Sequence, residues 1–403
     1  MPQTRSVSIN IFVGTGSRYE KPDEAGMSHF IEHACFRGTK KRPTAADICS
    51  AIEGTGGMLN AGTDKELTTY YCKVADPYWA SSLEVMTDII TNPVFAEAEI
   101  EKERQIIIEE INMTLDTPSQ RVGMLLDEIL WPNHPLGRDI AGNRKSVNSI
   151  SREKLLTHLR HEYQPSNTVV SVAGNIDETA VAEELERLLG GWKPGPYRRG
   201  FDPYRKSPGK AVKINRLNTE QTQICLAVPG LSMVDPDRFK FGVLNVILGE
   251  GMSSRLFTHI RDEMGLAYNI HSYAEYFIDT GAMTIAAGVE NENLKIAVTA
   301  ILKEMARLKE DIPKDEVERA KKLVKGRTLL RQEDSQAVAG WMGAQSILHQ
   351  RVYEVEEVLA MVDDTTVEDV MRLAQRLFVG HELRLAVVGP VDPGEPLKDL
   401  LEL

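Results

Sequence analysis

The chain has 403 residues, more than a single hydrophobic core usually supports, so two or more domains are expected. Its hydrophobic content of 42% and charged content of 26% are typical of a soluble globular protein, and its net charge of −12 argues against a nucleic-acid-binding surface. No apolar run reaches about 18 residues, which excludes a membrane-spanning helix, and four scattered cysteines without C-x-x-C spacing are typical of reduced thiols in a cytoplasmic protein.

The first predicted element is a strand near the N-terminus. Val7, Ile9 and Ile11 alternate with the polar residues Ser8 and Asn10, which is the period-two pattern of a strand. Nothing ahead of this strand resembles a signal peptide.

The segment after this strand contains the most informative motif of the chain. Residues 29–33 read H-x-x-E-H, the inverted form of a common zinc-protease motif. On a helix, His29, Glu32 and His33 lie on one face, so both imidazoles can bind one Zn²⁺ while the carboxylate points to the same place. Zn²⁺ lowers the pKa of a coordinated water to about 7, so a neighbouring carboxylate can accept its proton at neutral pH.

A catalytic zinc site needs a third protein ligand, and the acidic segment 97–113 is the best source of one. Its charged start and its spaced isoleucines predict an amphipathic helix. Glu103, Glu110 and, less squarely, Glu99 fall on one face of that helix. By composition alone, a solvated acidic face is the alternative interpretation.

A glycine-containing strand, 56–63, lies between these two segments. Its glycines permit close backbone approach, and an exposed strand edge can pair with an extended peptide through main-chain hydrogen bonds. A simple hairpin turn is the alternative interpretation of the same residues.

The chain then reads as a duplication. Residues 191–213 are rich in proline, glycine and basic residues and predict an interdomain linker, which places domains at 1–192 and 213–403 and the linker at 193–212. Strands and helices follow in the same order on both sides of it, which predicts two related α+β domains. The expected pairs are Ser6–Phe12 with Gln223–Val228, Leu67–Val74 with Gly281–Val289, Tyr78–Ile90 with Asn293–Leu308, Glu97–Met113 with Lys314–Arg331, and Asn167–Ala173 with Leu383–Val388.

The second half has no histidine pair at metal-ligand spacing, since His259 and His271 are isolated. Where the first half carries its metal helix, the second is expected to form a helix over 239–248. Residues 254–268 follow, and by themselves they predict an ordinary amphipathic helix that ends at a turn on Gly265.

Three segments together resemble one family. The family is the M16 (pitrilysin-type) zinc metallopeptidases, and the resemblance is strongest to mitochondrial processing peptidase β-subunits and their bacterial relatives. The three segments are HFIEHACFRGTKKRP, GGMLNAGTDKELTTYYCKV and EIEKERQIIIEEINM. In that family 76 residues separate the H-x-x-E-H motif from a third ligand, and here 76 residues separate His33 from Glu110. The resemblance implies one Zn²⁺ per chain, held by His29, His33 and Glu110. It also implies that Glu32 is the general base and that Glu103 orients a ligand histidine.

The resemblance extends to the rest of the site. Arg261 and Tyr268 match the family's R-x6-Y signature, in which the tyrosine donates a hydrogen bond near the scissile carbonyl and the arginine helps bind the substrate backbone. Asn60 and Ala61 match the family's active-site edge strand, which implies that they contact substrate. In a two-domain chain the Arg/Tyr pair acts on the metal of a second chain, so a homodimer is implied.

The resulting prediction is an α+β protein of two homologous M16-type domains, each a mostly antiparallel sheet packed with helices. The predicted function is a zinc-dependent endopeptidase that hydrolyses peptides or unfolded polypeptide segments in a dimeric chamber. The alternatives are the catalytic subunit of a heterodimeric processing peptidase and a non-catalytic structural or assembly subunit of the same fold. Because family members usually have one more N-terminal strand, that strand and any targeting segment are expected to be missing here.

Overall fold

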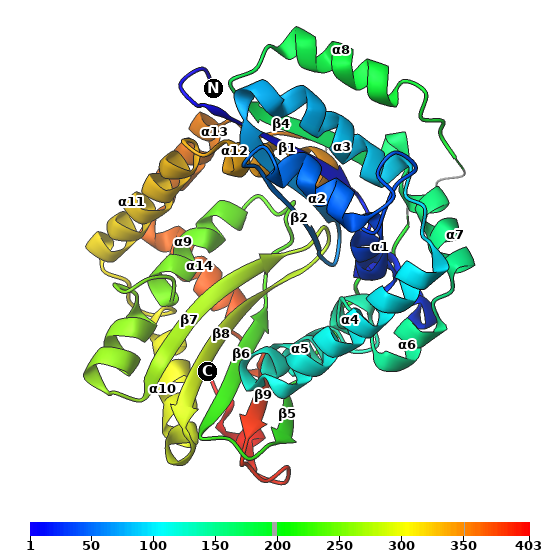
Figure 1. The fold of residues 1–403 in the computed structure, drawn as a ribbon. Coiled ribbons are helices and arrows are strands. Elements are labelled where there is room, and N and C mark those ends of the chain that lie inside the picture. The colour runs from blue at the N-terminus through cyan, green and yellow to red at the C-terminus, as the bar shows by residue number, and fades with distance from the viewer. Residues whose placement is uncertain (196–199, 350) are drawn as a thin grey trace. The chain divides into compact units, whose positions relative to one another are not determined.

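The chain folds into two compact units (Figure 1). The structure is a computed structural model that describes residues 1–195, 200–349 and 351–403. Residues 196–199, in the predicted linker, lie outside the described residues. Unit 1 comprises 1–112, 138–202 and 330–352, and unit 2 comprises 113–137, 203–329 and 353–403. Both units combine a β-sheet with packed helices, so the α+β prediction is confirmed.

Unit 1 is built on a four-stranded antiparallel sheet with the order β2-β3-β1-β4. Its strands are β1 (Ser6–Val13), β2 (Met58–Thr63), β3 (Thr68–Ala75) and β4 (Thr168–Gly174). Among the described residues β2 pairs only with β3, so one edge of β2 is open.

The helices of unit 1 lie on both faces of this sheet. They are α1 (Met27–Cys35), α2 (Ala45–Glu53), α3 (Trp79–Thr91), α4 (Glu97–Asp116, of which residues 97–112 belong to this unit), α6 (Arg144–Ser149), α7 (Arg152–Glu162), α8 (Glu178–Leu189) and α12 (Ser335–His349). The Ile11 side of β1 faces α1, because Tyr70 pairs with Ile11 across the sheet and its hydroxyl lies 3.6 Å from Cys35 Sγ.

The opposite face of β1 is covered by α12, which comes from the second half of the chain. Ser8 on this face is fully buried, and its Oγ lies 2.9 Å from Oγ of Ser335. Gly343 lets α12 approach the sheet, since a Cβ there would overlap the ring of Phe12. The polar alternation of β1 therefore marks a helix–sheet contact rather than a solvated face.

Unit 2 contains a five-stranded sheet with the order β5-β9-β6-β8-β7, in which only β5 and β9 run parallel. Its strands are β5 (Ala211–Arg216), β6 (Gln221–Pro229), β7 (Ala267–Tyr276), β8 (Gly281–Glu290) and β9 (Arg384–Gly389). Its helices are α5 (Pro118–Leu130), α9 (Arg238–Leu248), α10 (Leu294–Arg307), α11 (Lys314–Arg331, of which residues 314–329 belong to this unit), α13 (Val355–Asp363), α14 (Val367–Leu377) and a π-helix over Leu256–Glu263.

Helix α5 covers one face of the unit 2 sheet. This face carries small side chains, among them Cys225, Ala227 and Ala386, and α5 packs Leu126 and Leu130 against them. Each unit thus uses one helix from the other half of the chain, whereas contiguous halves were expected. The sequence shows that a helix has an apolar face but not which sheet that face covers.

The structure also bears on membrane-spanning helices and on the cysteines. Within the described parts of the chain, every helix is too short or too polar to cross a lipid bilayer. All four cysteines are free, and burial raises the pKa of the Cys35, Cys72 and Cys225 thiols to about 12. These three thiols are therefore protonated and unreactive at neutral pH.

Candidate metal centre

Helix α1, which carries His29 and His33, begins where the chain makes a left-handed turn at Gly26, with φ of 92°. A side chain at Gly26 would overlap the carbonyl of Ala141, so glycine is required there. The buried carboxylate of Glu20 accepts hydrogen bonds from the backbone N–H groups of Gly26 and Ser28, at 2.8 and 2.7 Å. These bonds fix the first turn of α1, which carries His29.

The three sequence-predicted ligand residues come together within unit 1. Nε2 of His29 and Nε2 of His33 are 3.2 Å apart, and Oε2 of Glu110 lies 3.8 Å from the first and 3.6 Å from the second. Zinc–ligand bonds of about 2.0–2.1 Å at tetrahedral angles put ligand atoms about 3.3 Å apart. The observed spacing therefore fits one zinc ion. His29, His33 and Glu110 form the one such cluster of metal-ligating side chains among the described residues.

Burial keeps His29 in the state that a metal requires. Desolvation, helped by the neighbouring His33, lowers the pKa of His29 to about 4. The imidazole is therefore neutral at physiological pH and has a lone pair available for a metal.

Glu32 lies on the same helix but is held by a different contact. The Thr63 hydroxyl at the end of β2 donates a 2.9 Å hydrogen bond to Oε2 of Glu32. Burial raises the pKa of Glu32 and Glu110 adds to this, whereas His33 and Thr63 lower it. Sequence reasoning missed Thr63, the last residue of the glycine-containing strand.

Glu103 lies on α4 two helical turns before Glu110. It contacts Nδ1 of His33, whereas Glu110 lies nearer Nε2. The Oε2 atom of Glu103 is 2.9 Å from Nδ1 of His33, and only 1% of the Glu103 side chain is exposed. The guanidinium of Arg37 forms an ion pair with the other oxygen of this carboxylate. Sequence reasoning also missed Arg37, which follows His33 by four residues.

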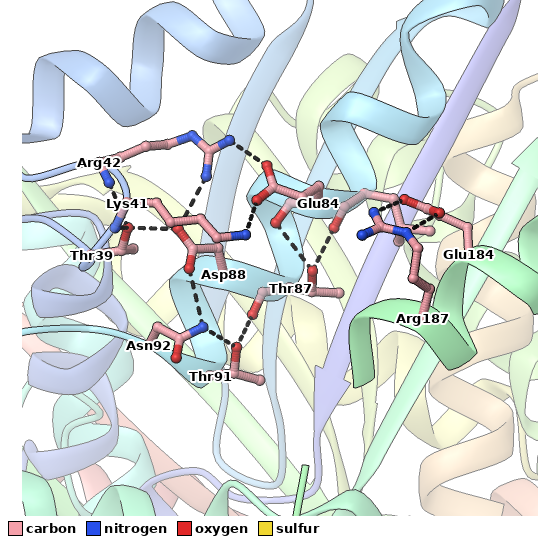
Figure 2. Close-up of polar contacts among 11 residues, drawn as sticks. Thr39, Lys41, Arg42, Glu84, Thr87, Asp88, Thr91, Asn92, Glu184 and Arg187 are labelled. Atoms are coloured by element: carbon pink, nitrogen blue, oxygen red, sulfur yellow. Dashed lines mark hydrogen bonds and ion pairs between the residues drawn. The ribbon is translucent and has the colours of Figure 1, made fainter. Parts of the chain in front are cut away.

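The loop that follows α1 is anchored to α3 by ion pairs (Figure 2). The buried carboxylate of Asp88 accepts from Thr39 at 2.6 Å and from Arg42 at 3.0 Å. Glu84, one turn earlier on α3, pairs with both Lys41 and Arg42. These contacts hold the loop beside the metal helix in one conformation.

The predicted substrate-contact residues Asn60 and Ala61 lie on β2, the open edge strand of the unit 1 sheet. Asn60 is exposed, and its Oδ1 accepts a 2.8 Å hydrogen bond from the N–H of Ala61. The strand contacts α1, so the open edge runs beside the metal helix.

Arg261 and Tyr268 lie together in unit 2. Arg261 is on the π-helix, and its guanidinium stacks on the rings of Phe257 and Tyr268 at 4.5 and 5.1 Å from their centroids. Tyr268 is the second residue of β7 and is 79% exposed. The predicted helix and its turn at Gly265 are present, but the helix has π geometry, which sequence periodicity did not indicate.

Unit 2 has a hydrogen-bonded network in place of a metal site. Asn245 on α9 donates to Glu250 at 2.8 Å and accepts from Ser272 on β7 at 2.7 Å. Arg327 on α11 pairs with the same Glu250. Because α9 and α11 take the places of α1 and α4 in the chain order, this network joins the counterparts of the two helices that carry His29, His33 and Glu110 in unit 1.

Two imidazoles and one carboxylate, with a second carboxylate alongside, are the donor set of a zinc hydrolase of the His₂Glu class. Two family models match the chain. One described as "Insulinase (Peptidase family M16)" matches residues 1–144, and one described as "Peptidase M16 inactive domain" matches residues 149–324. The chain belongs to the M16 peptidase family.

Similar proteins of known sequence cover nearly the whole chain. A protein of Rickettsia bellii, named an uncharacterized zinc protease, is 34% identical over 97% of this chain and 94% of its own length. The uncharacterized zinc protease YmxG of Bacillus subtilis is 34% identical over 96% of this chain and 94% of its own length.

Solved structures share the fold at lower identity. A protease from Helicobacter pylori matches with a TM-score of 0.90 and 22% identity, covering 96% of this chain and 95% of that one. A chain of the complex III₂ structure from Candida albicans matches with a TM-score of 0.84 and 19% identity, covering 100% of this chain and 96% of that one. These likenesses support the fold alone.

Proposed function

We propose that the protein is a zinc-dependent endopeptidase that hydrolyses peptides or unfolded polypeptide segments within a homodimer. The observation that carries this proposal is the convergence of His29, His33 and Glu110, with the carboxylate of Glu32 on the same helix. The sequence relatives are named uncharacterized zinc proteases, and these names point to the same chemistry.

One Zn²⁺ per chain would be held by Nε2 of His29, Nε2 of His33 and Oε2 of Glu110. When bound, it supplies a Lewis acid that polarises the scissile carbonyl and lowers the pKa of a water molecule. Glu103 holds the His33 ring through Nδ1, which leaves Nε2 directed at the other two ligands.

Glu32 is the proposed general base. Its carboxylate accepts the proton of the attacking water and then delivers it to the leaving amine of the peptide. The hydroxyl of Thr63 holds Oε2 and so limits rotation of the carboxylate. Raising the pKa of Glu32 by burial brings it closer to the operating pH, which favours both proton transfers.

The open edge of β2 is the proposed substrate platform. An extended peptide can add to this edge as another strand, with main-chain hydrogen bonds that are insensitive to sequence. Asn60 and Ala61 lie in the middle of the edge and would contact the peptide near the scissile bond. This mode suits unfolded segments, because a folded chain does not present a free strand.

Arg261 and Tyr268 are proposed to complete the site from a second copy of the chain. The stacked guanidinium keeps the exposed Tyr268 ring in place, and the phenol can donate a hydrogen bond to the developing oxyanion. A C2 homodimer supplies each metal site with one such pair from its partner.

A mixed quenched-fluorescent peptide library tests this proposal on the purified chain. We expect cleavage that a zinc chelator abolishes and that added Zn²⁺ restores, and no cleavage by Glu32→Gln at equal zinc content. Cleavage that survives zinc removal would overturn the proposal. A zinc-loaded chain that cleaves nothing by itself would instead favour the catalytic subunit of a heterodimer, and a chain without zinc would favour a structural subunit.

A further inference from the structure

Arg37 lies just beyond the metal helix, four residues after His33. Helix α1 ends at Cys35, and the N–H of Arg37 donates to the carbonyl of Ala34 at 3.1 Å, so the backbone still follows the last turn. This continuation puts the Arg37 side chain on the side of α1 that faces α4, where it meets Glu103.

The two oxygens of Glu103 have different partners. Oε2 contacts Nδ1 of His33 at 2.9 Å, and Oε1 forms the ion pair with Arg37. The carboxylate is 1% exposed, so water cannot replace either partner. A buried carboxylate that loses the cation paired with it carries an uncompensated charge and is free to turn about its last side-chain torsion.

Arg37 is the start of the loop between α1 and α2, and this loop is anchored to α3. The N–H of Val94 donates to the carbonyl of Gly38 at 3.0 Å, and Thr39 and Arg42 bind Asp88 on α3 (Figure 2). The guanidinium therefore reaches Glu103 from a fixed backbone, although 30% of its side chain is exposed.

We propose that Arg37 is a positioning residue of the metal centre, which acts on His33 through Glu103 by fixing the orientation of the buried carboxylate. The order of contacts is Arg37, Glu103, His33 and then the metal. The inference rests on the proposed zinc site but assigns a role to a residue that contacts neither metal nor substrate. Groups at this distance from a metal tune its affinity by orienting the ligand ring.

Zinc affinity, measured by chelator competition on the purified full chain, tests the inference. We expect Arg37→Met, which keeps most of the side-chain length but removes the charge, to weaken zinc binding by about tenfold. Arg37→Lys is expected to recover most of the affinity, because an ammonium can still neutralise Glu103. Lys40→Met is the matched control, because it removes one positive charge from an exposed residue of the same loop that is not among the anchoring contacts described above.

The outcomes separate this inference from the proposed function. Wild-type affinity in Arg37→Met, or equal weakening by Lys40→Met, would overturn the role of Arg37 while leaving the zinc site in place. If the unmodified chain bound no zinc, the proposed function would fail first. The melting temperature of each metal-free variant shows whether a loss of affinity comes from loss of folding.

Discussion

The Nδ1 atom of His33 lies 2.9 Å from a buried oxygen of Glu103, although 70 positions separate the two residues in the chain. The two ring nitrogens therefore have different neighbours, since Nδ1 contacts Glu103 and Nε2 faces His29 and Glu110. A ring held in this way presents one lone pair in one direction, which is what a metal ligand needs. The predictions below follow from this arrangement and from the groups around it.

Removing a ligand should remove the metal. We expect His33→Ala and Glu110→Ala to lose bound zinc, because two protein ligands do not retain Zn²⁺ as three do. Metal analysis of purified protein after dialysis measures this. Glu109→Ala is the control, since Glu109 is exposed and neighbours the ligand on α4. Unchanged zinc content in either ligand variant would refute the ligand set.

Replacing the proposed base should separate catalysis from metal binding. Glu32→Gln is expected to lower kcat by about 10²–10⁴-fold, because the amide cannot accept a proton, while zinc content stays at the wild-type level. Peptide cleavage and metal analysis on the same sample measure both. Glu53→Gln, an exposed change on α2, should leave both unaltered. Full activity in Glu32→Gln would rule out its role as base.

The Thr63 hydroxyl should matter through Glu32 alone. Thr63→Val keeps the side-chain shape but removes the hydrogen bond to a carboxylate, which is worth about 1.5–3 kcal/mol, so kcat/KM should fall by about 10–100-fold. Thr63→Ser keeps the hydroxyl and should recover activity. Zinc affinity should be the same in all three proteins. If Val and Ser have equal effects, the hydroxyl is not the cause.

Mixing two inactive variants tests whether Tyr268 acts across a dimer. Tyr268→Phe should lower kcat by about 10²–10³-fold, the loss seen when one oxyanion donor is removed. If the tyrosine acts on a second copy, a heterodimer of Glu32→Gln and Tyr268→Phe regains one intact site out of two. Random mixing makes about half of the dimers heterodimers, so about a quarter of wild-type activity should return. Absence of any recovery in verified heterodimers would exclude action across the dimer.

Acid stability should depend on His158, which lies on α7 with its Nε2 buried and without a hydrogen-bond partner among the described residues. Burial, helped by His161, lowers its pKa from 6.5 to about 4 in the folded chain. Between these values the unfolded chain binds a proton that the folded chain does not, so this group makes the free energy of unfolding fall as the pH drops from 6.5 towards 4.

His158→Leu should remove this contribution. Between pH 6.5 and 5 the wild type should lose up to about 2 kcal/mol more than the variant. Urea denaturation of the metal-free chain at both pH values measures the difference without interference from zinc release. His381→Leu, at a residue whose side chain is 68% exposed, is the control. Parallel pH dependence in His158→Leu and wild type would contradict the prediction.

Much of the secondary structure could be predicted from periodicity. The strand expected over Ser6–Phe12 is Ser6–Val13, and the helix expected over Lys314–Arg331 has those bounds. The helix expected over Glu97–Met113 continues to Asp116. These elements were recognisable because a buried face repeats every 2 or 3.6 residues within one segment.

The packing between distant segments could not be predicted from periodicity. Nothing in the α12 sequence indicates that its Ser335 faces Ser8 of β1, since a helix surface does not record which sheet it covers. Thr63 and Arg37 were overlooked for the same reason. Each is an ordinary polar residue until the fold brings it to Glu32 or Glu103.

The sequence by itself determined the local chemistry of this protein. His29, Glu32 and His33 lie on one helical turn, and helix geometry alone brings them to one face. The tertiary structure decided which groups surround them, because Glu110, Glu103 and Thr63 reach α1 only through long-range packing. The same packing brings Glu103 to Arg37 at the end of α1. Short-range geometry is set by the backbone repeat, whereas contacts between distant segments depend on how whole elements bury their apolar faces.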